Sequence, residues 1–371
     1  MTASTTGAAG GQSLLAADLP LSHDSHHEGH RPHPRPQGIG MAGSIATGCA
    51  LVVCVVARLP HRILDATGIR AWGLALVVVV IVVSGVRALA RAPFTLSSSQ
   101  AGEETKTFVA CIAVGTVTTV PLYALIRATS AWWLLAWLLF AAVTVIWQIA
   151  TPLALRAQVG PLTPAPAPLT DRVQAIAARA GVDVGGVTLA GKPGSNRCNA
   201  YVVGLGPTRR VVLEQAVALW PPDLVDQVVA HELGHWRLGH SARRLPLTLL
   251  CQLTALGAAA AVLSSTPLLS WAGIADVGDP ASYPLLLVLG AALSFPARCL
   301  LAWRDRGQER AADRFALTLL DQPDEFAAML QRAADESGAP RSLPWWLRLT
   351  ASHPPIDERA AACPQGARPC L

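Results

Sequence analysis

Six long apolar runs give the chain its dominant pattern. Each approaches the roughly 20 residues that a helix needs to cross a bilayer. The runs lie near residues 41–58, 71–90, 107–127, 131–155, 245–265 and 283–303. A single run of this kind is more often a buried core helix, but six in one chain predict a mainly helical, multi-pass bundle with about six membrane spans.

A more polar segment between the fourth and fifth runs shows shorter periodicities. A proline-rich connection, residues 161–168, precedes Thr170, which we predict to be the N-cap of a helix that Gly181 ends. Three β-branched segments predict short strands near 187–189, 200–203 and 210–213. A further helix is predicted to begin at Pro222 and to run to about Gly239. This segment is therefore expected to form a small α+β domain.

The composition agrees with a membrane protein. Of the 371 residues, 52% are hydrophobic and 14% are charged, and the mean hydropathy is +0.40. The net charge of +5 is explained by basic residues that flank membrane spans. The sequence has no basic stripe with interleaved aromatic residues, so no nucleic-acid partner is expected. The eight cysteines lack CxxC spacing, which argues against a disulfide framework and against a cysteine metal site.

Residues 1–40 have a composition of their own. They are rich in Gly, Ser, Pro and His, so they cannot form a core, and we predict a disordered tail. They lack a basic start and a short apolar stretch with a cleavage site, so a cleaved signal peptide is not expected. Five histidines are candidates for weak zinc capture, although a solvated tail without a metal is favoured. They are His23, His26, His27, His30 and His33.

The charges of the connections predict an orientation in the membrane. The connection 266–282 contains Asp276 and Asp279 and no Lys or Arg, whereas residues 156–244 are rich in arginine. Because basic residues favour the cytoplasmic side, this polar segment is predicted to be cytoplasmic. Four spans before this segment would put the N-terminus on the cytoplasmic side as well. The connection between the first two spans would then lie on the outer side, although it is basic. The orientation of the first hairpin therefore stays open, because that connection contains Arg58, Arg62 and Arg70.

A metal-binding motif lies in the helix predicted from Pro222. Residues four apart share one helical face, so His231 and His235 can direct imidazole nitrogens at one ion, with Glu232 beside it. In zinc peptidases the metal polarises the scissile carbonyl and lowers the pKa of its water to about 7. A neighbouring carboxylate transfers the proton of that water to the leaving amine. We predict one Zn²⁺ per chain, with His231 and His235 as ligands and Glu232 as the general base.

The third ligand is not adjacent to the motif. A metzincin would have glycine at 238 and histidine at 241, but this chain has Leu238 and Ser241, and His240 is out of phase by one position. A second helix offers Glu309 and Asp313, four residues apart on one face. Glu309 is the candidate third ligand. Asp313 is the candidate acceptor for the far nitrogen of a ligand histidine.

Taken together, these motifs resemble the HtpX-like and CAAX-prenyl-protease-like (type 1) family of membrane zinc peptidases. The similar segments occur in the same order and context, and they cover roughly residues 161–359. They are NAYVVG (199–204), RRVVL (209–213), AHELGH (230–235), ERAAD (309–313) and HPPIDER (353–359). The combined pattern is much more specific than any single motif.

The resemblance implies a gluzincin-type zinc peptidase domain and roles for further residues. An extended substrate would pair with the strand that contains Asn199, Ala200 and Tyr201, as an additional β-strand. His353 or Arg359 would stabilise the oxyanion of the tetrahedral intermediate. From the residues alone, Arg359 is equally well explained as a salt-bridge partner.

These predictions divide the chain into five parts. Residues 1–40 are the tail, 41–156 hold four transmembrane helices, and 157–244 form the first part of the peptidase domain. Residues 245–303 form a transmembrane hairpin, and 304–371 form the second part of the domain, with the third ligand. The protein is expected in the cell membrane with a cytoplasmic catalytic domain. Its alanine-rich, lysine-poor composition suggests a bacterium with GC-rich DNA.

The predicted function is zinc-dependent cleavage of membrane or membrane-proximal polypeptides in quality control. A prenyl-cysteine substrate is less expected in such a bacterium. One alternative is a regulatory membrane protease of the antibiotic-sensor type, although we identify no external sensor domain. A metal transporter is disfavoured, because ion paths need ionisable groups within the membrane. The six runs hold almost none except near their ends, such as Arg87 and Arg298.

Overall fold

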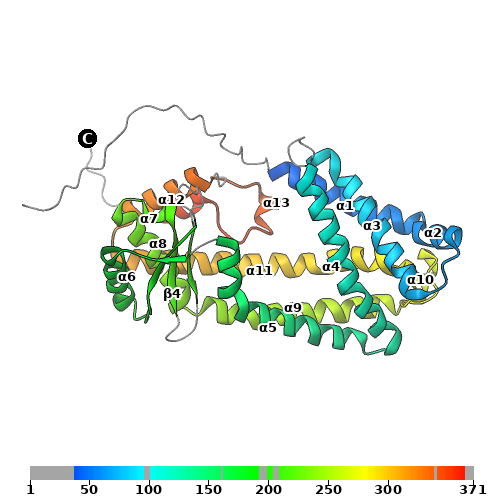
Figure 1. The fold of residues 1–371 in the computed structure, drawn as a ribbon. Helices are drawn as coiled ribbons and strands as arrows, with labels where there is room; N and C mark the ends of the chain where they lie inside the picture. The colour runs from blue at the N-terminus through cyan, green and yellow to red at the C-terminus, as the bar shows by residue number, and fades with distance from the viewer. Residues whose placement is uncertain are drawn as a thin grey trace, which may run out of the picture. The chain divides into compact units, whose positions relative to one another are not determined.

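The described part of the chain is mainly helical. The computed structural model describes residues 37–95, 101–159, 162–191, 199–203, 209–337 and 341–363. All of them belong to one compact unit, and Figure 1 labels most of its helices and the strand β4. The predicted disordered tail, with its five histidines, lies outside the described residues except for positions 37–40.

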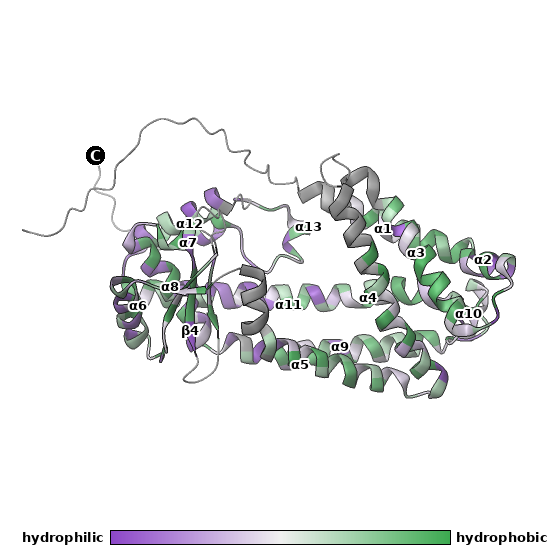
Figure 2. Cartoon of the chain, in the orientation of Figure 1, coloured by the Kyte–Doolittle hydropathy of each residue, from purple (hydrophilic) through white to green (hydrophobic). Residues whose placement is uncertain are grey.

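Each predicted apolar run coincides with a helix. The six helices are α1 (Gln37–Val56), α3 (Trp72–Thr95), α4 (Ala101–Ala128), α5 (Trp132–Val159), α9 (His240–Leu263) and α11 (Tyr283–Leu320). The connections contain α2 (Leu59–Thr67), α10 (Thr266–Ala272) and a 3-10 turn (Pro280–Ser282). Figure 2 shows hydrophobic residues along these helices and more hydrophilic residues around the sheet. The predicted mainly helical class is therefore confirmed.

Length and hydropathy alone identify fewer than six spans. Within the described residues, three helices are long and apolar enough to cross a membrane, namely α3, α9 and α11. A fourth results if α1 and α2, which are bent by 57° at a short break, count as one broken span. The apolar parts of α4 and α5, Ile112–Ala128 and Trp132–Gln148, belong to a shorter class of 10–17 residues. The count of six spans remains a prediction.

The polar segment contains a four-stranded mixed sheet. Its strands are β1 (Leu162–Pro164), β2 (Val187–Ala190), β3 (Ala200–Val203) and β4 (Arg210–Glu214), in the order β1-β2-β4-β3. The β2–β4 pair is parallel and the other two pairs are antiparallel. The three predicted strands are confirmed. The proline-rich connection additionally supplies β1, and β3 is an edge strand among the described residues.

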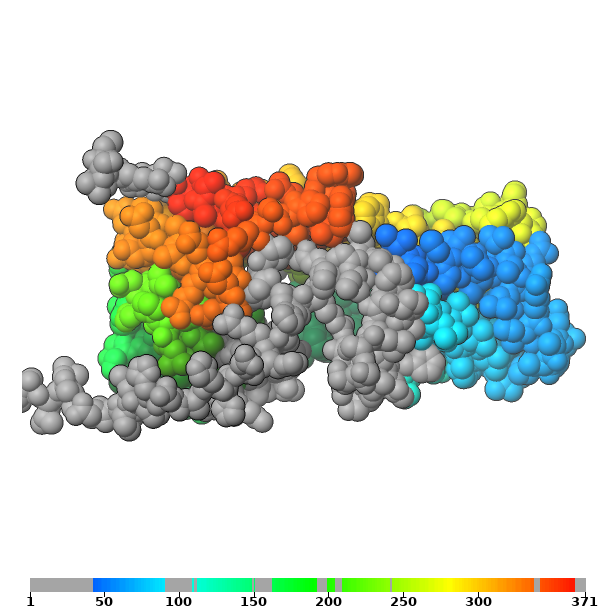
Figure 3. Space-filling model, turned by 90° about the horizontal axis from the view of Figure 1, so that it is seen from above, coloured from blue at the N-terminus to red at the C-terminus, as the bar shows by residue number. Residues whose placement is uncertain are grey.

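Helices from distant parts of the sequence surround this sheet. They are α6 (Ala167–Arg179), α7 (Gln215–Ala218), α8 (Pro222–Arg237), α12 (Pro323–Ser337) and α14 (Ile356–Ala361). Between α12 and α14, the short helix α13 (Trp345–Arg348) is bonded to α11 through Arg348 O, which accepts from Arg306. A shared core joins Val173 of α6, Leu213 of β4, Leu233 of α8 and Phe326 of α12. In Figure 3 the orange and red residues that follow α11 lie beside the green residues of this region. The second part of the chain thus completes the core of the first.

Two helix boundaries refine the sequence predictions. The prediction of Thr170 as an N-cap is wrong, because α6 begins at Ala167 and Thr170 lies inside it. Pro168 is compatible with a first helical turn, where its missing N–H needs no partner. The motif helix α8 begins at Pro222 as predicted and ends at Arg237. Gly239 then adopts φ +65°, a left-handed conformation that glycine accepts without strain, and α9 begins directly after it.

The helix α11 connects the apolar region to the α+β domain without a break. At 1.5 Å per residue its 38 residues extend about 57 Å, well beyond the roughly 30 Å of a hydrocarbon core. The predicted domain boundary at residue 303 therefore falls inside a continuous helix. Near its end α11 packs closely on α8, and a Cβ at Gly234 would lie 3.3 Å from Ala312 Cα.

The close contact at Gly234 gives a stability prediction. A Cβ at this position would also lie 3.0 Å from Phe315 Cδ1, so Gly234→Leu must separate α8 from α11. We expect the substitution to lower the free energy of unfolding by roughly 1–3 kcal/mol, as overpacking does. The measurement is the thermal unfolding midpoint of the detergent-solubilised protein. The control is Gly290→Leu on α11, where a Cβ meets no atom within 4 Å. Equal midpoints for both variants would contradict this account of the contact.

Candidate active site

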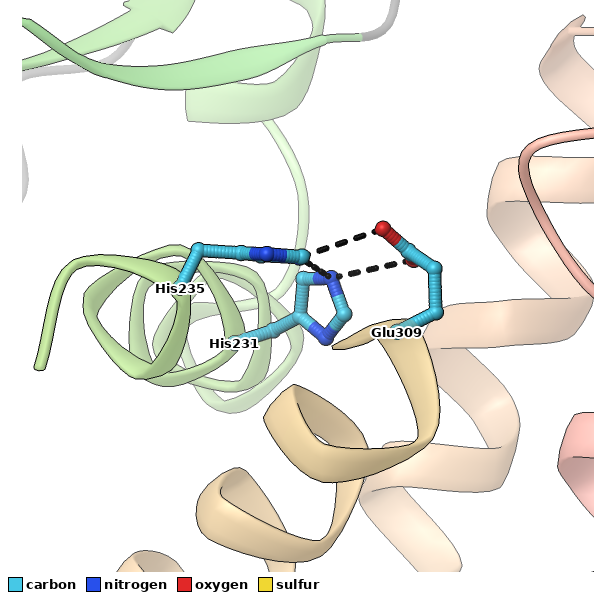
Figure 4. Close-up of side chains that lie close together, drawn as sticks. All are labelled: His231, His235 and Glu309. Atoms are coloured by element: carbon cyan, nitrogen blue, oxygen red, sulfur yellow. Dashed lines mark hydrogen bonds and ion pairs between the residues drawn. The ribbon is translucent and has the colours of Figure 1, made fainter. Parts of the chain in front are cut away.

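Three side chains from α8 and α11 converge on one point (Figure 4). His231 and His235 lie one helical turn apart on α8, and their Nε2 atoms are 3.1 Å apart. Glu309 of α11 faces both rings. Its Oε2 lies 3.5 Å from His231 Nε2, and its Oε1 lies 3.2 Å from His235 Nε2. The structure thus brings together the three residues predicted as metal ligands.

The spacing of these atoms suits a zinc ion. In a tetrahedral site with bonds of about 2.0–2.1 Å, two ligand atoms are separated by about 3.3 Å. The three observed separations of 3.1, 3.2 and 3.5 Å scatter around this value. Two imidazoles and one carboxylate are also a donor set that catalytic zinc accepts, with a fourth position for water. These three residues are the group among the described residues that could hold a metal ion.

A buried ion-pair chain supports His231. Its Nδ1 lies 2.9 Å from Asp313 Oδ1, on the side opposite to Glu309. Arg359 of α14 donates from Nε to Asp313 Oδ2 at 2.9 Å and from Nη2 to Asp313 Oδ1 at 2.6 Å. A carboxylate beside Nδ1 favours the tautomer with its proton there, which leaves the Nε2 lone pair free for a metal.

His235 has a corresponding partner that the sequence interpretation missed. His240 Nδ1 lies 2.9 Å from His235 Nδ1, and the His240 side chain is buried. Burial is the main cause that lowers the pKa of His240 to about 4, so the ring is neutral and its Nδ1 can accept a hydrogen bond from the Nδ1–H of His235. The spacing of His240 excludes it as a metzincin-type ligand, and helical periodicity does not predict this second contact. Its proximity depends on the left-handed turn at Gly239, which the Gly-His dipeptide signals only weakly.

The remaining polar residues lie around this centre. Glu232 is half-buried on α8. Burial raises the pKa of its carboxyl, while His231 and His235 oppose that shift. His353 lies before α14 with 66% of its side chain exposed, and its Nδ1 is 3.0 Å from Glu309 Oε2. The hydrogen bond to Glu309 raises the pKa of His353.

The edge strand β3 lies next to the motif helix. It packs against α8, and Tyr201 pairs with Val212 of β4 in the antiparallel register. Asn199 directly precedes the strand. Its Oδ1 accepts from the Ala200 backbone N–H at 2.9 Å, and its Nδ2 donates to Tyr201 Oη at 2.8 Å. The three residues predicted to contact substrate therefore form one locally ordered unit at the sheet edge.

Comparison with known proteins agrees with this arrangement. Residues 166–365, more than half of the chain, match peptidase family M48. The chain belongs to peptidase family M48. Members of this family are zinc-dependent metalloproteases, so the prediction of a membrane zinc metalloprotease is confirmed at the level of the family. The described parts of the matched region include all three side chains that converge in Figure 4.

Several curated proteins are similar to this chain in sequence. The CAAX prenyl protease 1 homolog of Oryza sativa is 29% identical over 178 residues, which are 46% of this chain and 41% of the relative. The uncharacterized metalloprotease YhfN of Bacillus subtilis is 28% identical over 169 residues, 44% of this chain and 40% of the relative. The matched part thus spans less than half the length of these curated relatives.

One solved structure shares the fold. The crystal structure of Ste24p from S. mikatae superimposes with a TM-score of 0.59 and 18% sequence identity. The match covers 71% of this chain and 65% of Ste24p. This share of the chain is larger than residues 166–365, which match family M48, so the structural similarity includes apolar helices as well as the α+β domain. The chain therefore has the fold of a membrane protein.

The contact between His240 and His235 gives a prediction about metal affinity. Loss of such a partner typically costs 10-fold to 100-fold in affinity, so we expect His240→Ala to weaken zinc binding by about that factor. His240→Gln, which retains an acceptor, should recover part of the loss. The measurement is competition for zinc between the purified protein and a chelating indicator. The control is His61→Ala, a partly exposed histidine of α2 beside Asp279. Unchanged affinity in His240→Ala would refute a positioning role.

Proposed function

We propose that the chain is a zinc-dependent endopeptidase that cleaves membrane or membrane-proximal polypeptides. One observation carries the proposal: the metal-binding group lies on helices that continue into apolar segments. Glu309 lies on α11 itself, and α9 begins directly after the motif helix. A site built in this way lies close to the membrane surface, where substrate segments that emerge from the bilayer can reach it.

The catalytic roles follow from the positions of the side chains. His231, His235 and Glu309 would hold the zinc ion, and Asp313 would fix the tautomer of His231. When bound, zinc polarises the scissile carbonyl and acidifies a water molecule. Glu232, adjacent to a ligand on α8, takes a proton from the attacking water and delivers it to the leaving amine. The burial that raises the pKa of Glu232 suits a group that must both accept and release that proton.

His353 is the better candidate for stabilising the oxyanion. The Arg359 side chain is buried, and two of its nitrogens are bonded to Asp313. His353 is mostly exposed on the loop before α14, and the raised pKa of its imidazole favours the protonated form, which carries two donors. A positive donor near the developing negative charge lowers the activation free energy. Arg359 instead holds Asp313 against His231.

The backbone of β3 supports pairing with an extended substrate. Asn199 O accepts from Glu214 N at 3.0 Å, so residues 199 and 214 form a hydrogen-bonded pair. In an antiparallel pair of strands, residue pairs that exchange hydrogen bonds alternate with pairs that exchange none. Ala200 and Val202 belong to pairs of the second kind, so their amides point away from β4. The Ala200 amide is bonded to Asn199 Oδ1, which leaves the Val202 amide for a substrate strand.

The membrane arrangement and the substrate class belong to the same proposal. We infer six spans, a catalytic domain on the cytoplasmic side and a bacterial cell membrane, because the apolar runs and the arginine-rich polar segment agree with them. Quality control of membrane proteins is the favoured role. Cleavage of a prenylated C-terminus is the second candidate, because similar proteins in rice, Arabidopsis and human are named CAAX prenyl proteases.

The role of Glu232 gives a direct test. In liposomes that contain a single-span model protein with an unfolded extension, we expect Glu232→Gln to lower the cleavage rate by about 10²-fold to 10⁴-fold, the usual contribution of a general base. Zinc content, measured by mass spectrometry of the metal, should stay unchanged. Glu325→Gln on α12 makes the same charge change outside the site and should cleave normally. Undiminished cleavage by zinc-loaded Glu232→Gln would exclude this base.

The same preparation separates the two substrate classes. A farnesylated peptide that ends in a CAAX sequence is offered in parallel with the model membrane protein. The quality-control proposal expects cleavage of the unfolded extension and no preference for the farnesylated peptide over the same peptide without the lipid. A strong preference for the farnesylated form would overturn it in favour of the second candidate. Membrane proteomics of cells with active protein and with Glu232→Gln then identifies natural substrates.

The outward amide of β3 gives a test of substrate pairing. Val202→Pro removes that N–H without removing a bond to β4, so the edge of the sheet should tolerate it. One net hydrogen bond contributes about 0.5–1.5 kcal/mol, so KM should rise about 2-fold to 10-fold at constant kcat. Val202→Ala, which keeps the N–H, is the matched control. Equal KM values for the two variants, with unfolding midpoints like the wild type, would argue against pairing at this strand.

A further inference from the structure

A basic pocket lies where α9 and α11 reach the α+β domain. Its volume is about 370 Å³, and its walls include Arg243 of α9 and Trp303, Arg304, Gly307 and Arg310 of α11. None of the residues that line it is acidic. The pocket contains none of the predicted zinc ligands and not Glu232, but His240, which contacts His235, is one of its lining residues. The pocket therefore adjoins the metal-binding group without including it.

Among the arginines that line the pocket, one is paired with an acidic side chain of the described residues and two are not. Arg310 Nη2 is bonded to Glu358 at 2.8 Å. The neighbouring Arg244, outside the pocket, pairs with Asp305. Arg243 and Arg304 have no such partner in the described part of the chain, and Arg304 Nε is buried there without any acceptor. A buried guanidinium nitrogen without a partner is costly, so the pocket favours an anion.

Exposed apolar side chains continue from the pocket along both helices. On α11, Leu300 is 43% exposed and Trp303 is 66% exposed, and Arg304 follows on the same helical face. On α9, Leu250 is 55% exposed and lies two turns after Arg243. Because the two helices pack against each other in opposite directions, both surfaces change from apolar to basic towards the α+β domain.

This order matches the order of groups in a phospholipid. We propose that the pocket binds the phosphate of an anionic phospholipid, whose acyl chains lie along the exposed apolar surface of α9 and α11. Guanidinium groups bind phosphate oxygens in pairs, and tryptophan favours the interface between headgroups and chains. Basic pockets between membrane helices are suited to such headgroups. A free anion would satisfy the arginines and leave Leu300, Trp303 and Leu250 without contacts.

The proposal rests on the membrane placement proposed above, but its test does not use proteolysis. The full chain is purified in detergent and titrated with phosphatidylglycerol or phosphatidylcholine, and bound lipid is measured by native mass spectrometry. Both lipids carry a phosphate, but phosphatidylcholine also carries a choline cation, which the arginines repel. We therefore expect phosphatidylglycerol to bind at least about 10-fold more tightly. A protein that binds this lipid but fails to cleave would overturn the proposed function alone.

Two kinds of variant locate the site. Arg243→Gln combined with Arg304→Gln should abolish the preference for phosphatidylglycerol. The matched control, Arg210→Gln combined with Arg237→Gln, removes the same charge from exposed positions elsewhere on the α+β domain and should retain the preference. A Cβ at Gly307 meets no atom within 4 Å, so Gly307→Trp should fill the pocket without disturbing the fold and should also abolish the preference.

Three outcomes would overturn the proposal. The first is equal binding of the two lipids by the wild type. The second is an equal loss of preference in the matched control, which would show attraction by net charge rather than a site. The third is inorganic phosphate that displaces phosphatidylglycerol at equal concentration, which would identify a site for free anions. Thermal unfolding of each variant confirms that the protein measured is folded.

Discussion

The contact between α8 and α11 is the constraint on which the rest of the site depends. The two helices are far apart in sequence. Because Gly234 has no side chain, their backbones approach so closely that a Cβ at this position would lie 3.3 Å from Ala312 Cα. The same two segments hold the imidazoles of His231 and His235 and the carboxylate of Glu309 within the distances that zinc requires. Because the packed interior has little free volume, displacement of either helix would change all three distances together.

Polar groups buried around this contact stabilise a single geometry. Arg359 holds Asp313, and Asp313 lies against His231, while His240 lies against His235. Each ligand imidazole is thus fixed at its far nitrogen, which sets its tautomer and the direction of its Nε2. Burying a charge costs free energy unless the charge is paired, so these ion pairs stabilise the fold as well as the chemistry of the site.

The apolar helices continue directly into the segments that form the metal-binding site. The helix α11 extends from the apolar region into the α+β domain, and α9 begins one left-handed residue after the motif helix. The arginines and the exposed tryptophan of the basic pocket lie on these same helices, between the apolar surface and the metal-binding group. Position along these two helices therefore sets the order of the apolar surface, the basic pocket and the metal-binding group.

The sequence by itself determined what depends on neighbouring residues. Apolar runs of sufficient length specify helices, alternation specifies short strands, and a spacing of four places His231 and His235 on one face. Only the tertiary structure decided that Glu309 reaches these rings, that β3 is an edge strand and that Arg359 is bonded to Asp313. Helical periodicity does not put His240 beside His235, because the contact depends on the turn at Gly239. Local patterns encode local geometry, whereas contacts between distant segments depend on how whole helices pack.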